Sequence, residues 1–150
     1  MLTKLRDVVK VINGKSQKEV ENSSGLYPVY GSGGIIGKAD AYSCLSGSTI
    51  IGRKGTINNP LFIETNFWNV DTAFGMKPSK AVKDLFFYYF CKSFDFTSLD
   101  KSSTLPSLTK SAIEGIALPI PPLEEQHRII LKIKKYDELF QNIFTQLEQK

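Results

Sequence analysis

Residues 118–150 read LPIPPLEEQHRIILKIKKYDELFQNIFTQLEQK, and this stretch divides the chain into two parts. Apolar residues recur in it at alternating intervals of four and three positions, which is the spacing of a coiled-coil seam. Glu124 and Glu125 stand in the first turn, where negative charge stabilises a helix N-terminus. The pattern predicts one long helix over residues 123–150 that binds a partner helix. Its partner-binding seam consists of Ile129, Ile133, Tyr136, Phe140, Ile143 and Leu147.

Prolines at positions 119, 121 and 122 precede this helix. Because proline lacks a backbone donor and has a fixed φ, we expect residues 119–122 to form an extended, stiff connector. The 28 residues that follow would make a helix about 42 Å long, which is longer than a domain of this size can cover. We therefore interpret the helix as an arm that pairs with another helix. Packing of the helix on its own domain is the alternative.

Residues 1–118 are rich in glycine, serine, threonine and aromatic residues, and turns separate their short apolar stretches. The pattern predicts strands at residues 26–30, 35–36, 49–52, 67–70, 73–76 and 116–120, and helices at residues 84–93 and 111–115. These elements lack the regular spacing of βαβ units. The sequence thus predicts an α+β fold: a small domain with a mixed or antiparallel sheet and short helices, followed by a long coiled-coil helix.

The chain has 150 residues, 41% hydrophobic and 23% charged, which suits one compact domain with its own core. No apolar run approaches the roughly 20 residues of a membrane span, and the N-terminus lacks the apolar region of a signal peptide. We therefore expect a cytoplasmic protein with no membrane partner, in which Cys44 and Cys91 are reduced core thiols. The net charge of +4 lies wholly in residues 1–120. This charge is weak evidence for a polyanionic partner, and a basic solvated surface is the alternative.

The sequence offers little catalytic chemistry. His127 is the only histidine, and it lies on the predicted helix away from the seam, so neither a zinc site nor a Ser-His-Asp triad is expected. The glycine cluster at residues 31–37 matches neither the dinucleotide-binding motif nor the P-loop. Residues 58–62, NNPLF, match the Asn-Pro-Pro-aromatic loop of adenine methyltransferases only in part. We predict a non-catalytic protein that has no cofactor and no metal.

Two polar loops carry side chains of the kind that contact DNA. Arginine and lysine bind guanine or phosphate, asparagine pairs with adenine, and hydroxyl groups bind phosphate. A glycine-rich hairpin near residue 32 would also bring its backbone close to a ligand. These features favour double-stranded DNA as the partner. The candidate DNA-binding residues are Arg53, Lys54, Gly55, Thr56, Asn58 and Asn59 in the first loop, Lys101, Ser102, Ser103 and Thr104 in the second, and Tyr30, Ser32 and Gly33 in the hairpin.

Several segments resemble, in the same order, the target-recognition domain of the specificity subunit of type I restriction–modification systems. They are residues 5–8 (LRDV) with Gly14, 30–37 (YGSGGIIG), 50–56 (IIGRKGT), 67–68 (FW), 71–73 (DTA) and 105–108 (LPSL). The most specific is the junction at residues 116–126 (IALPIPPLEEQ), with Ile129 after it. The resemblance covers nearly the whole chain and does not identify a target sequence.

This resemblance implies that residues 1–118 recognise DNA and direct a separate adenine methyltransferase subunit to it, together with a translocating restriction subunit. The usual family member has two such domains, each followed by a helix, and the helices pair antiparallel as a spacer. Because this chain has one domain and one helix, the resemblance implies a half-subunit that homodimerises through residues 123–150 and reads a bipartite site. The alternative is an assembly or decoy protein that binds methyltransferase subunits through the helix without reading DNA.

Overall fold

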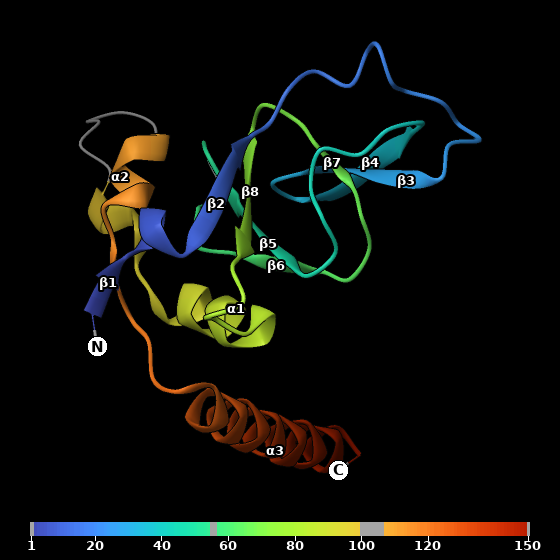
Figure 1. The fold of residues 1–150 in the computed structure, drawn as a ribbon. Helices are drawn as coiled ribbons and strands as arrows, with labels where there is room; N and C mark the ends of the chain where they lie inside the picture. Colours follow the sequence, from blue (N-terminus) through green and yellow to red (C-terminus); the bar gives the residue numbers. More distant parts are fainter. Residues whose placement is uncertain (1, 55–56, 100–106, 150) are drawn as a thin grey trace.

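A computed structural model of the chain describes residues 2–54, 57–99 and 107–149. Figure 1 shows small sheets and short helices joined to one long helix, α3 (Leu123–Glu148). The strands are β1 (Leu2–Lys4), β2 (Val9–Asn13), β3 (Tyr27–Gly31), β4 (Gly34–Ala39), β5 (Ser48–Gly52), β6 (Leu61–Ile63), β7 (Trp68–Asn69), β8 (Ala73–Pro78) and β9 (Ala117–Pro119). The shorter helices are α1 (Asp84–Ser93) and α2 (Lys110–Glu114), with 3₁₀ turns η1 (Leu5–Asp7) and η2 (Phe96–Leu99). This architecture confirms the predicted α+β fold.

The central sheet has four antiparallel strands in the order β2-β8-β5-β6. Alternate residues of a strand point to opposite faces of the sheet, and here both faces are covered. Ile51 and Phe74 belong to a core cluster on one face, whereas Ile50 and Ala73 belong to a second cluster on the other. Every residue of β5 is consequently buried, which explains why its sequence, STIIG, lacks a polar face.

Helices cover one face of this sheet. Phe87 and Cys91 of α1, Phe96 of η2 and Ile113 of α2 are buried in the same cluster as Met76 of β8. The first of these helices spans residues 84–93, as predicted, and its phenylalanines supply much of the core on this side. The aromatic run DLFFYYFCKS is therefore explained by packing against the sheet.

A three-stranded sheet, β4-β3-β7, covers the other face. β3 and β4 form an antiparallel hairpin, and β7 runs parallel to β3, so the domain contains both kinds of pairing. The side-chain amide of Asn69 in β7 is fully buried and donates to the carbonyl oxygens of Ile12 and Ala73, at 3.2 and 3.0 Å. Because these acceptors belong to β2 and β8, Asn69 joins the two sheets by hydrogen bonds that satisfy its buried amide.

Both cysteines are free and buried, as expected of core thiols. Cys44 lies in the cluster between the two sheets, and Cys91 lies under α1. Burial raises the pKa of the Cys44 thiol to about 11, and it raises the pKa of Cys91 further.

The two ends of the domain meet in the small ribbon β1-β9. Leu2 pairs with Pro119, and the N–H of Leu5 donates to the carbonyl oxygen of Ile116 at 2.8 Å. The first proline of the expected connector thus ends a strand, a position at the edge of a sheet that proline tolerates. Residues 120–122 have neither helix nor strand and lead directly into α3.

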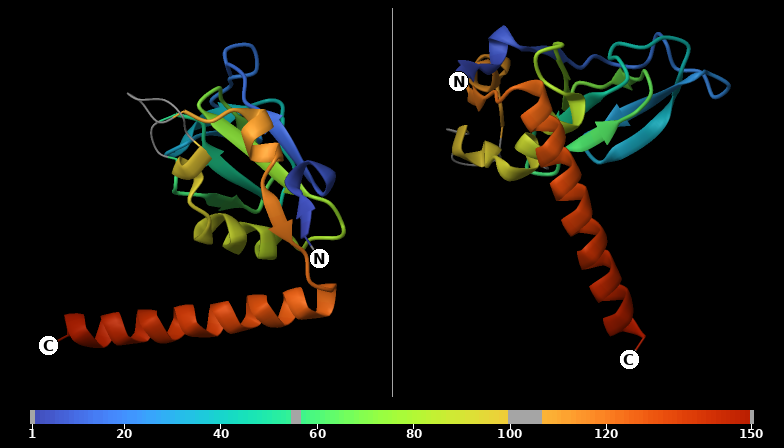
Figure 2. Two further views of the ribbon diagram at one scale, coloured as in Figure 1. Left: turned by 90° about the vertical axis from the view of Figure 1, so that its left-hand side faces the viewer. Right: turned by 60° about the horizontal axis from the view of Figure 1, so that its bottom comes forward.

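The start of α3 is fixed to the domain by a buried glutamine. Gln126 has no exposed surface, and its side-chain oxygen accepts a hydrogen bond from the N–H of Lys83 at 2.7 Å. Its side-chain nitrogen donates to the carbonyl oxygens of Ala81 and Pro121, at 3.0 and 2.8 Å. Lys83 is the N-cap residue of α1, so Gln126 ties the start of one helix to the start of the other. Figure 2 shows α3 extending past the domain from this junction.

The strands β1, β2 and β6, in residues 2–13 and 61–63, are not predicted by the sequence pattern. In β2, Val9 and Val11 are buried and Lys10 is exposed, which is the alternation of a strand with one covered face. The remaining predicted strands and helices are present, and their ends differ from the predicted ones by at most three residues. None of the described helices combines the length and the apolar character that crossing a membrane requires.

We predict that Gln126→Leu lowers the free energy of unfolding by about 2 kcal/mol, because it removes three hydrogen bonds from partly buried backbone groups of Lys83, Ala81 and Pro121. Gln141→Leu is the matched control, since Gln141 is exposed on the same helix, and its effect should stay within about 0.5 kcal/mol. Urea unfolding at one protein concentration measures both variants. Equal stability of the two variants would contradict the anchoring role of Gln126.

Candidate nucleic-acid interface

Three loops meet at one end of the central sheet. β5 ends at Gly52, opposite Ala73, the first residue of β8. The N–H of Arg53 donates to the carbonyl oxygen of Thr72 at 2.8 Å, which joins the loop after β5 to the turn before β8. Gly31, at the hairpin tip, lies beside the same turn, because a Cβ added to it would be 3.7 Å from Thr72 Oγ1. We call residues 31–36, 53–54 and 70–72 together the loop surface.

The second predicted loop ends on this surface. Lys54 and Ser107 form an isolated antiparallel bridge, and the N–H of Leu108 donates to the carbonyl oxygen of Arg53 at 2.9 Å. The second loop therefore returns to the place where the first begins. Six of the predicted DNA-binding residues lie outside the described residues: Gly55, Thr56, Lys101, Ser102, Ser103 and Thr104.

The described candidates on the loop surface are largely accessible. Arg53 and Lys54 are exposed, and the guanidinium carbon of Arg53 lies 5.9 Å from the centroid of the buried Phe74 ring. Such a cation–π contact contributes about 0.5–1 kcal/mol at an exposed site and orients the guanidinium. Ser32 is half-buried and Gly33 is exposed, with no atom within 4 Å of a Cβ added to Gly33. A ligand can therefore approach the backbone of the hairpin tip.

Tyr30 is placed differently. It is half-buried, and its ring packs edge-on against Phe67, with the ring centroids 5.5 Å apart. Phe67 is itself fully buried between the sheets. The Tyr30 ring thus packs the hairpin against the core, and only the part of the ring that is exposed to solvent can contact a ligand.

The two neighbouring asparagines also differ. Asn58 donates to the carboxylate of Asp95 at 2.7 Å and accepts from the N–H of Phe96 at 2.8 Å, so its amide holds the loop to η2. Hydrogen bonds from the Thr97 hydroxyl and from Asn58 hold the pKa of Asp95 below its ordinary value. Asn59 is exposed beside this anchor. Because the amide of Asn58 already has these two partners, Asn59 is the better candidate for contacting a base.

Lys15 and Thr72 belong to the same region but were not among the predicted site residues. The N–H of Lys15 donates to the carbonyl oxygen of Asn69 at 3.0 Å, and Trp68 Nε1 donates to the carbonyl oxygen of Lys15 at 3.1 Å. The approach needs Gly14, where an added Cβ would lie 1.7 Å from the Val70 carbonyl oxygen. Lys15 is exposed and adds a positive charge near the turn at residues 70–72. Only the fold brings it there, 38 positions before Arg53 in the sequence.

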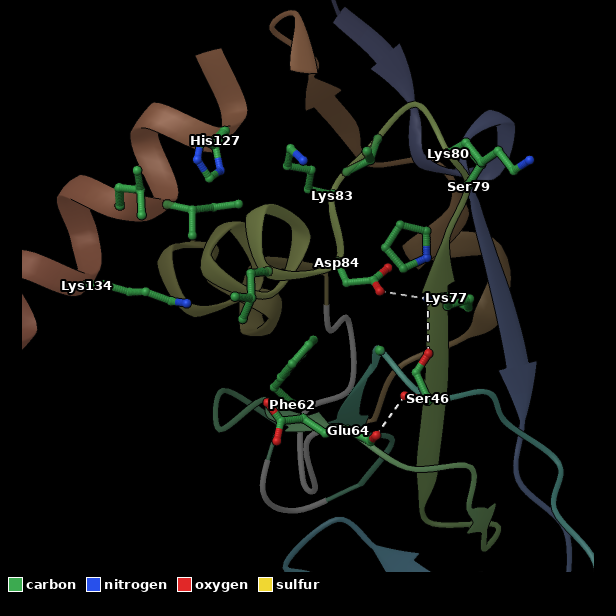
Figure 3. Close-up of a pocket in the computed structure, with 16 residues that line it drawn as sticks. Ser46, Phe62, Glu64, Lys77, Ser79, Lys80, Lys83, Asp84, His127 and Lys134 are labelled. Carbon is green, nitrogen blue, oxygen red and sulfur yellow. Dashed lines mark hydrogen bonds and ion pairs between the residues drawn. The ribbon is translucent and has the colours of Figure 1, made fainter. Parts of the chain in front are cut away.

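A hollow lies away from the loop surface. A groove of about 830 Å³ lies between the far ends of the sheet strands and the first turns of α1 and α3 (Figure 3). His127 and Lys134 of α3 border it on one side, and Lys77 of β8 and Phe62 of β6 border it on the other. β8 runs from the loop surface to this groove, so its six residues separate the two regions by roughly 17–20 Å.

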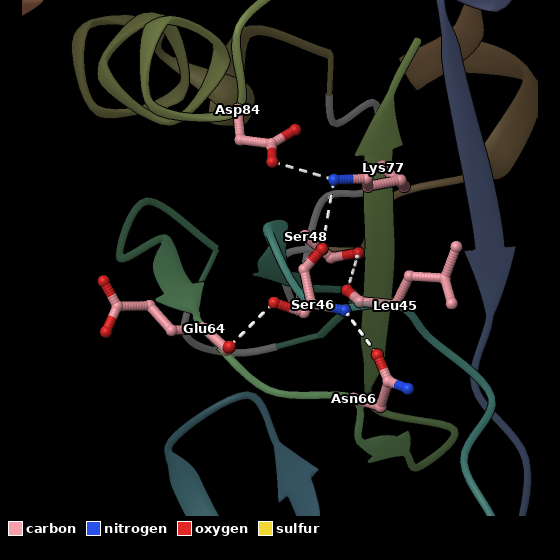
Figure 4. A network of polar contacts seen from close by, with 7 residues as sticks. All are labelled: Leu45, Ser46, Ser48, Glu64, Asn66, Lys77 and Asp84. Carbon is pink, nitrogen blue, oxygen red and sulfur yellow. Dashed lines mark hydrogen bonds and ion pairs between the residues drawn. The ribbon is translucent and has the colours of Figure 1, made fainter. Parts of the chain in front are cut away.

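The polar groups of the groove bind one another. Lys77 Nζ donates to the Asp84 carboxylate at 2.8 Å and to the Ser46 carbonyl oxygen at 3.0 Å (Figure 4). Ser46 in turn donates through its hydroxyl to the Glu64 carbonyl oxygen at 2.7 Å. Within residues 2–54, 57–99 and 107–149, His127 makes no hydrogen bond to a serine or an acidic side chain. The network therefore links the end of β8 to the start of α1 and to the segments on either side of β5 and β6. It does not bring a nucleophile together with a general base.

The predicted seam of α3 divides into two sections. Ile129 and Ile133 are half-buried where α3 packs against α1, so the domain itself covers the start of the seam. The rest lies beyond the domain and is exposed: Tyr136 (52%), Phe140 (59%), Ile143 (52%) and Leu147 (60%). Leu139 and Phe144, also exposed, widen the same apolar face. The alternative, a helix packed along its whole length on its own domain, is thus wrong for the second half of α3.

A small α+β domain with accessible polar loops at one end and a long projecting helix describes the architecture of the chain. The model of the type I restriction modification DNA specificity domain matches residues 1–150, and the chain belongs to this family. Because this is a family of specificity domains, the chain is a specificity module and not an enzyme.

Two curated relatives are specificity subunits from Methanocaldococcus jannaschii. The MjaVIII subunit is 29% identical over 107 residues, 69% of this chain and 22% of the relative. The putative MjaX subunit is 33% identical over 70 residues, 45% of this chain and 16% of the relative. The chain thus spans about a fifth of the length of these relatives.

Solved structures of type I systems have the same fold. The S subunit from M. genitalium has a TM-score of 0.74 at 17% identity, over 97% of this chain and 41% of that chain. The HsdS subunit from Thermoanaerobacter tengcongensis has a TM-score of 0.76 at 18% identity, over 93% of this chain and 37% of that chain. A chain from a study of type I complex assembly has a TM-score of 0.81 at 19% identity, over 95% and 39%.

We predict that Asn58→Ala lowers the free energy of unfolding by about 1 kcal/mol, because the N–H of Phe96 loses its acceptor. Asn59→Ala is the matched control, since it changes an exposed residue of the same type and should alter stability by less than about 0.5 kcal/mol. Thermal unfolding followed by circular dichroism measures both. A larger loss for Asn59→Ala than for Asn58→Ala would refute this division of roles.

Proposed function

We propose that the chain reads a DNA sequence with its loop surface and directs separate adenine methyltransferase and restriction–translocase subunits to that site. The observation that supports this most is the convergence of Arg53, Lys54 and the hairpin tip at one end of a DNA specificity domain. In the sequence these segments are separated; in the fold they form one accessible surface. Chemistry at the target would come from the partner subunits.

The loop surface, together with Lys15 and Asn59, has the groups that DNA recognition needs. Lys54 and Lys15 carry positive charges that suit phosphate contacts, which position a protein on the duplex. Arg53 can bind guanine through two N–H groups, and Asn59 can pair with adenine in the same two-bonded way. The open backbone at Gly33 and the hydroxyl of Ser32 add donors for phosphate or base edges.

We further propose that two copies pair through α3. A second copy would cover the exposed apolar residues of the seam, which continue directly from the half-buried Ile129 and Ile133. The charges on the helix favour an antiparallel arrangement, because its first part is net basic and its last part is net acidic. Residues 123–135 have four basic residues (Arg128, Lys132, Lys134 and Lys135) against Glu124 and Glu125, and residues 136–150 have three acidic residues (Asp137, Glu138 and Glu148) against Lys150.

The length of α3 agrees with this arrangement. Its 26 residues span about 39 Å, close to the 34–36 Å between DNA half-sites one helical turn apart. A two-fold dimer would therefore present two loop surfaces to an inverted, bipartite site, with the paired helices as spacer. An assembly or decoy protein would share the exposed seam, and the loop-surface variants below distinguish it from a DNA reader.

We predict that Arg53→Ala weakens binding to the preferred duplex by about 1–3 kcal/mol and flattens the preference at one base pair. Fluorescence anisotropy with single-base variants of that duplex measures both effects. Lys80→Ala is the control, because Lys80 is an exposed cation at the groove end of the domain and should leave the base preference intact. An equal loss for every sequence would make Arg53 a phosphate contact, and intact binding by Arg53→Ala/Lys54→Ala would favour the decoy.

We predict that Phe140→Glu raises the dissociation constant of the dimer by about a hundredfold or more, because it removes two buried rings and introduces two charges. Asn142→Glu is the control, because it adds the same charge at a position roughly 200° around the helix from Phe140, and it should leave the dimer intact. Sedimentation equilibrium measures both. A wild-type chain that stays monomeric at tens of micromolar, with and without DNA, would rule out the homodimer.

A further inference from the structure

The β3–β4 hairpin contains a β-bulge at an apolar position. Val29 pairs with Gly37 and Tyr30 pairs with Ile35, so Ile36 is an extra residue in β4 without a partner in β3. A bulge interrupts the regular alternation of side chains and turns one of them in a new direction. Consecutive residues of a strand normally lie on opposite faces, yet Ile35 and Ile36 are 63% and 55% exposed. The hairpin thus presents two adjacent isoleucines to solvent.

This isoleucine pair adjoins the polar part of the loop surface. A Cβ added to Gly31 would lie 3.8 Å from Ile36 Cγ2 and 3.7 Å from Thr72 Oγ1, so both side chains border the same glycine. Thr72 in turn accepts the backbone hydrogen bond of Arg53 at 2.8 Å. Isoleucine methyl groups, a threonine hydroxyl and an arginine therefore follow one another across a single surface.

An apolar element in this position suits one feature of DNA. In the major groove, thymine alone presents a 5-methyl group, and proteins recognise it by apolar contact beside hydrogen bonds to neighbouring base edges. The branched side chain of isoleucine has little conformational freedom to lose on contact. The open glycines 33 and 34 next to the pair, with nothing within 4 Å of an added Cβ, let the tip approach a surface closely.

We propose that Ile35 and Ile36 are specificity-determining residues that contact thymine 5-methyl groups in the DNA target. This inference rests on the proposed function, because it requires that the loop surface binds DNA. It adds thymine to the guanine and adenine that Arg53 and Asn59 are proposed to bind. The isoleucines discriminate thymine from cytosine, and Arg53 contributes the hydrogen bonds beside them.

The experiment uses the full chain with its methyltransferase subunit and two probes. One is the duplex that the wild type enriches from a random pool; the other is the same duplex with deoxyuridine in place of each thymidine in turn, which removes a single methyl group. For the wild type, replacing a contacted thymidine by deoxyuridine should weaken binding about fourfold. Ile36→Ala or Ile35→Ala should weaken binding to the thymidine duplex and abolish the thymidine–deoxyuridine difference at one position. Both residues are exposed, so the variants should keep wild-type thermal stability.

Leu26→Ala is the matched control. Leu26 is 87% exposed and directly precedes the opposite end of β3, so its loss should change neither affinity nor the thymidine–deoxyuridine difference. Wild-type binding that no deoxyuridine substitution weakens, or isoleucine variants that keep the full difference, overturns this inference and leaves the proposed function standing. A wild-type complex that enriches no sequence from the pool overturns both.

Discussion

The arrangement of the whole molecule depends on the buried amide of Gln126. Its three hydrogen bonds, to backbone groups of Lys83, Ala81 and Pro121, lie where the connector, α1 and α3 meet. Stiff prolines alone would set a direction for the chain but would not hold the helix against the domain. Because a buried amide must keep its hydrogen-bond partners, the first turns of α3 have one favourable position on the domain. The direction of the projecting helix is therefore a property of the domain core.

The junction of α3 with the domain lies at the opposite end of the central sheet from the loop surface. β8 connects the two, with Ala73 beside Arg53 and Lys77 beside Asp84 at the groove. Both faces of the sheet are buried, so its strands form a rigid element between the site that contacts a ligand and the helix that contacts a partner. A change in the hairpin or the loops is therefore separated from the helix junction by the length of the sheet.

The sequence predicted the elements with strong periodic signals and missed those that depend on tertiary contacts. The α3 seam and the aromatic helix at 84–93 followed from spacing, whereas β2 was overlooked although Val9 and Val11 alternate with a polar residue. Loop chemistry indicated Arg53 and Lys54, but it could not distinguish Asn58, which binds Asp95 and Phe96, from Asn59. Lys15 reaches the turn before β8 only through the fold, and Gln126 reads in the sequence as one more polar residue on a helix surface.

We propose that two copies of this chain present their loop surfaces to DNA at a separation fixed by paired α3 helices. Selection from a random duplex pool, with the cognate methyltransferase subunit bound, tests this arrangement. We expect a split motif with two inverted halves and one constant spacer, close to a helical turn of DNA from centre to centre. Enrichment of a single half-motif would keep sequence reading and contradict the symmetric pair. An intact complex that enriches no motif would contradict DNA reading itself.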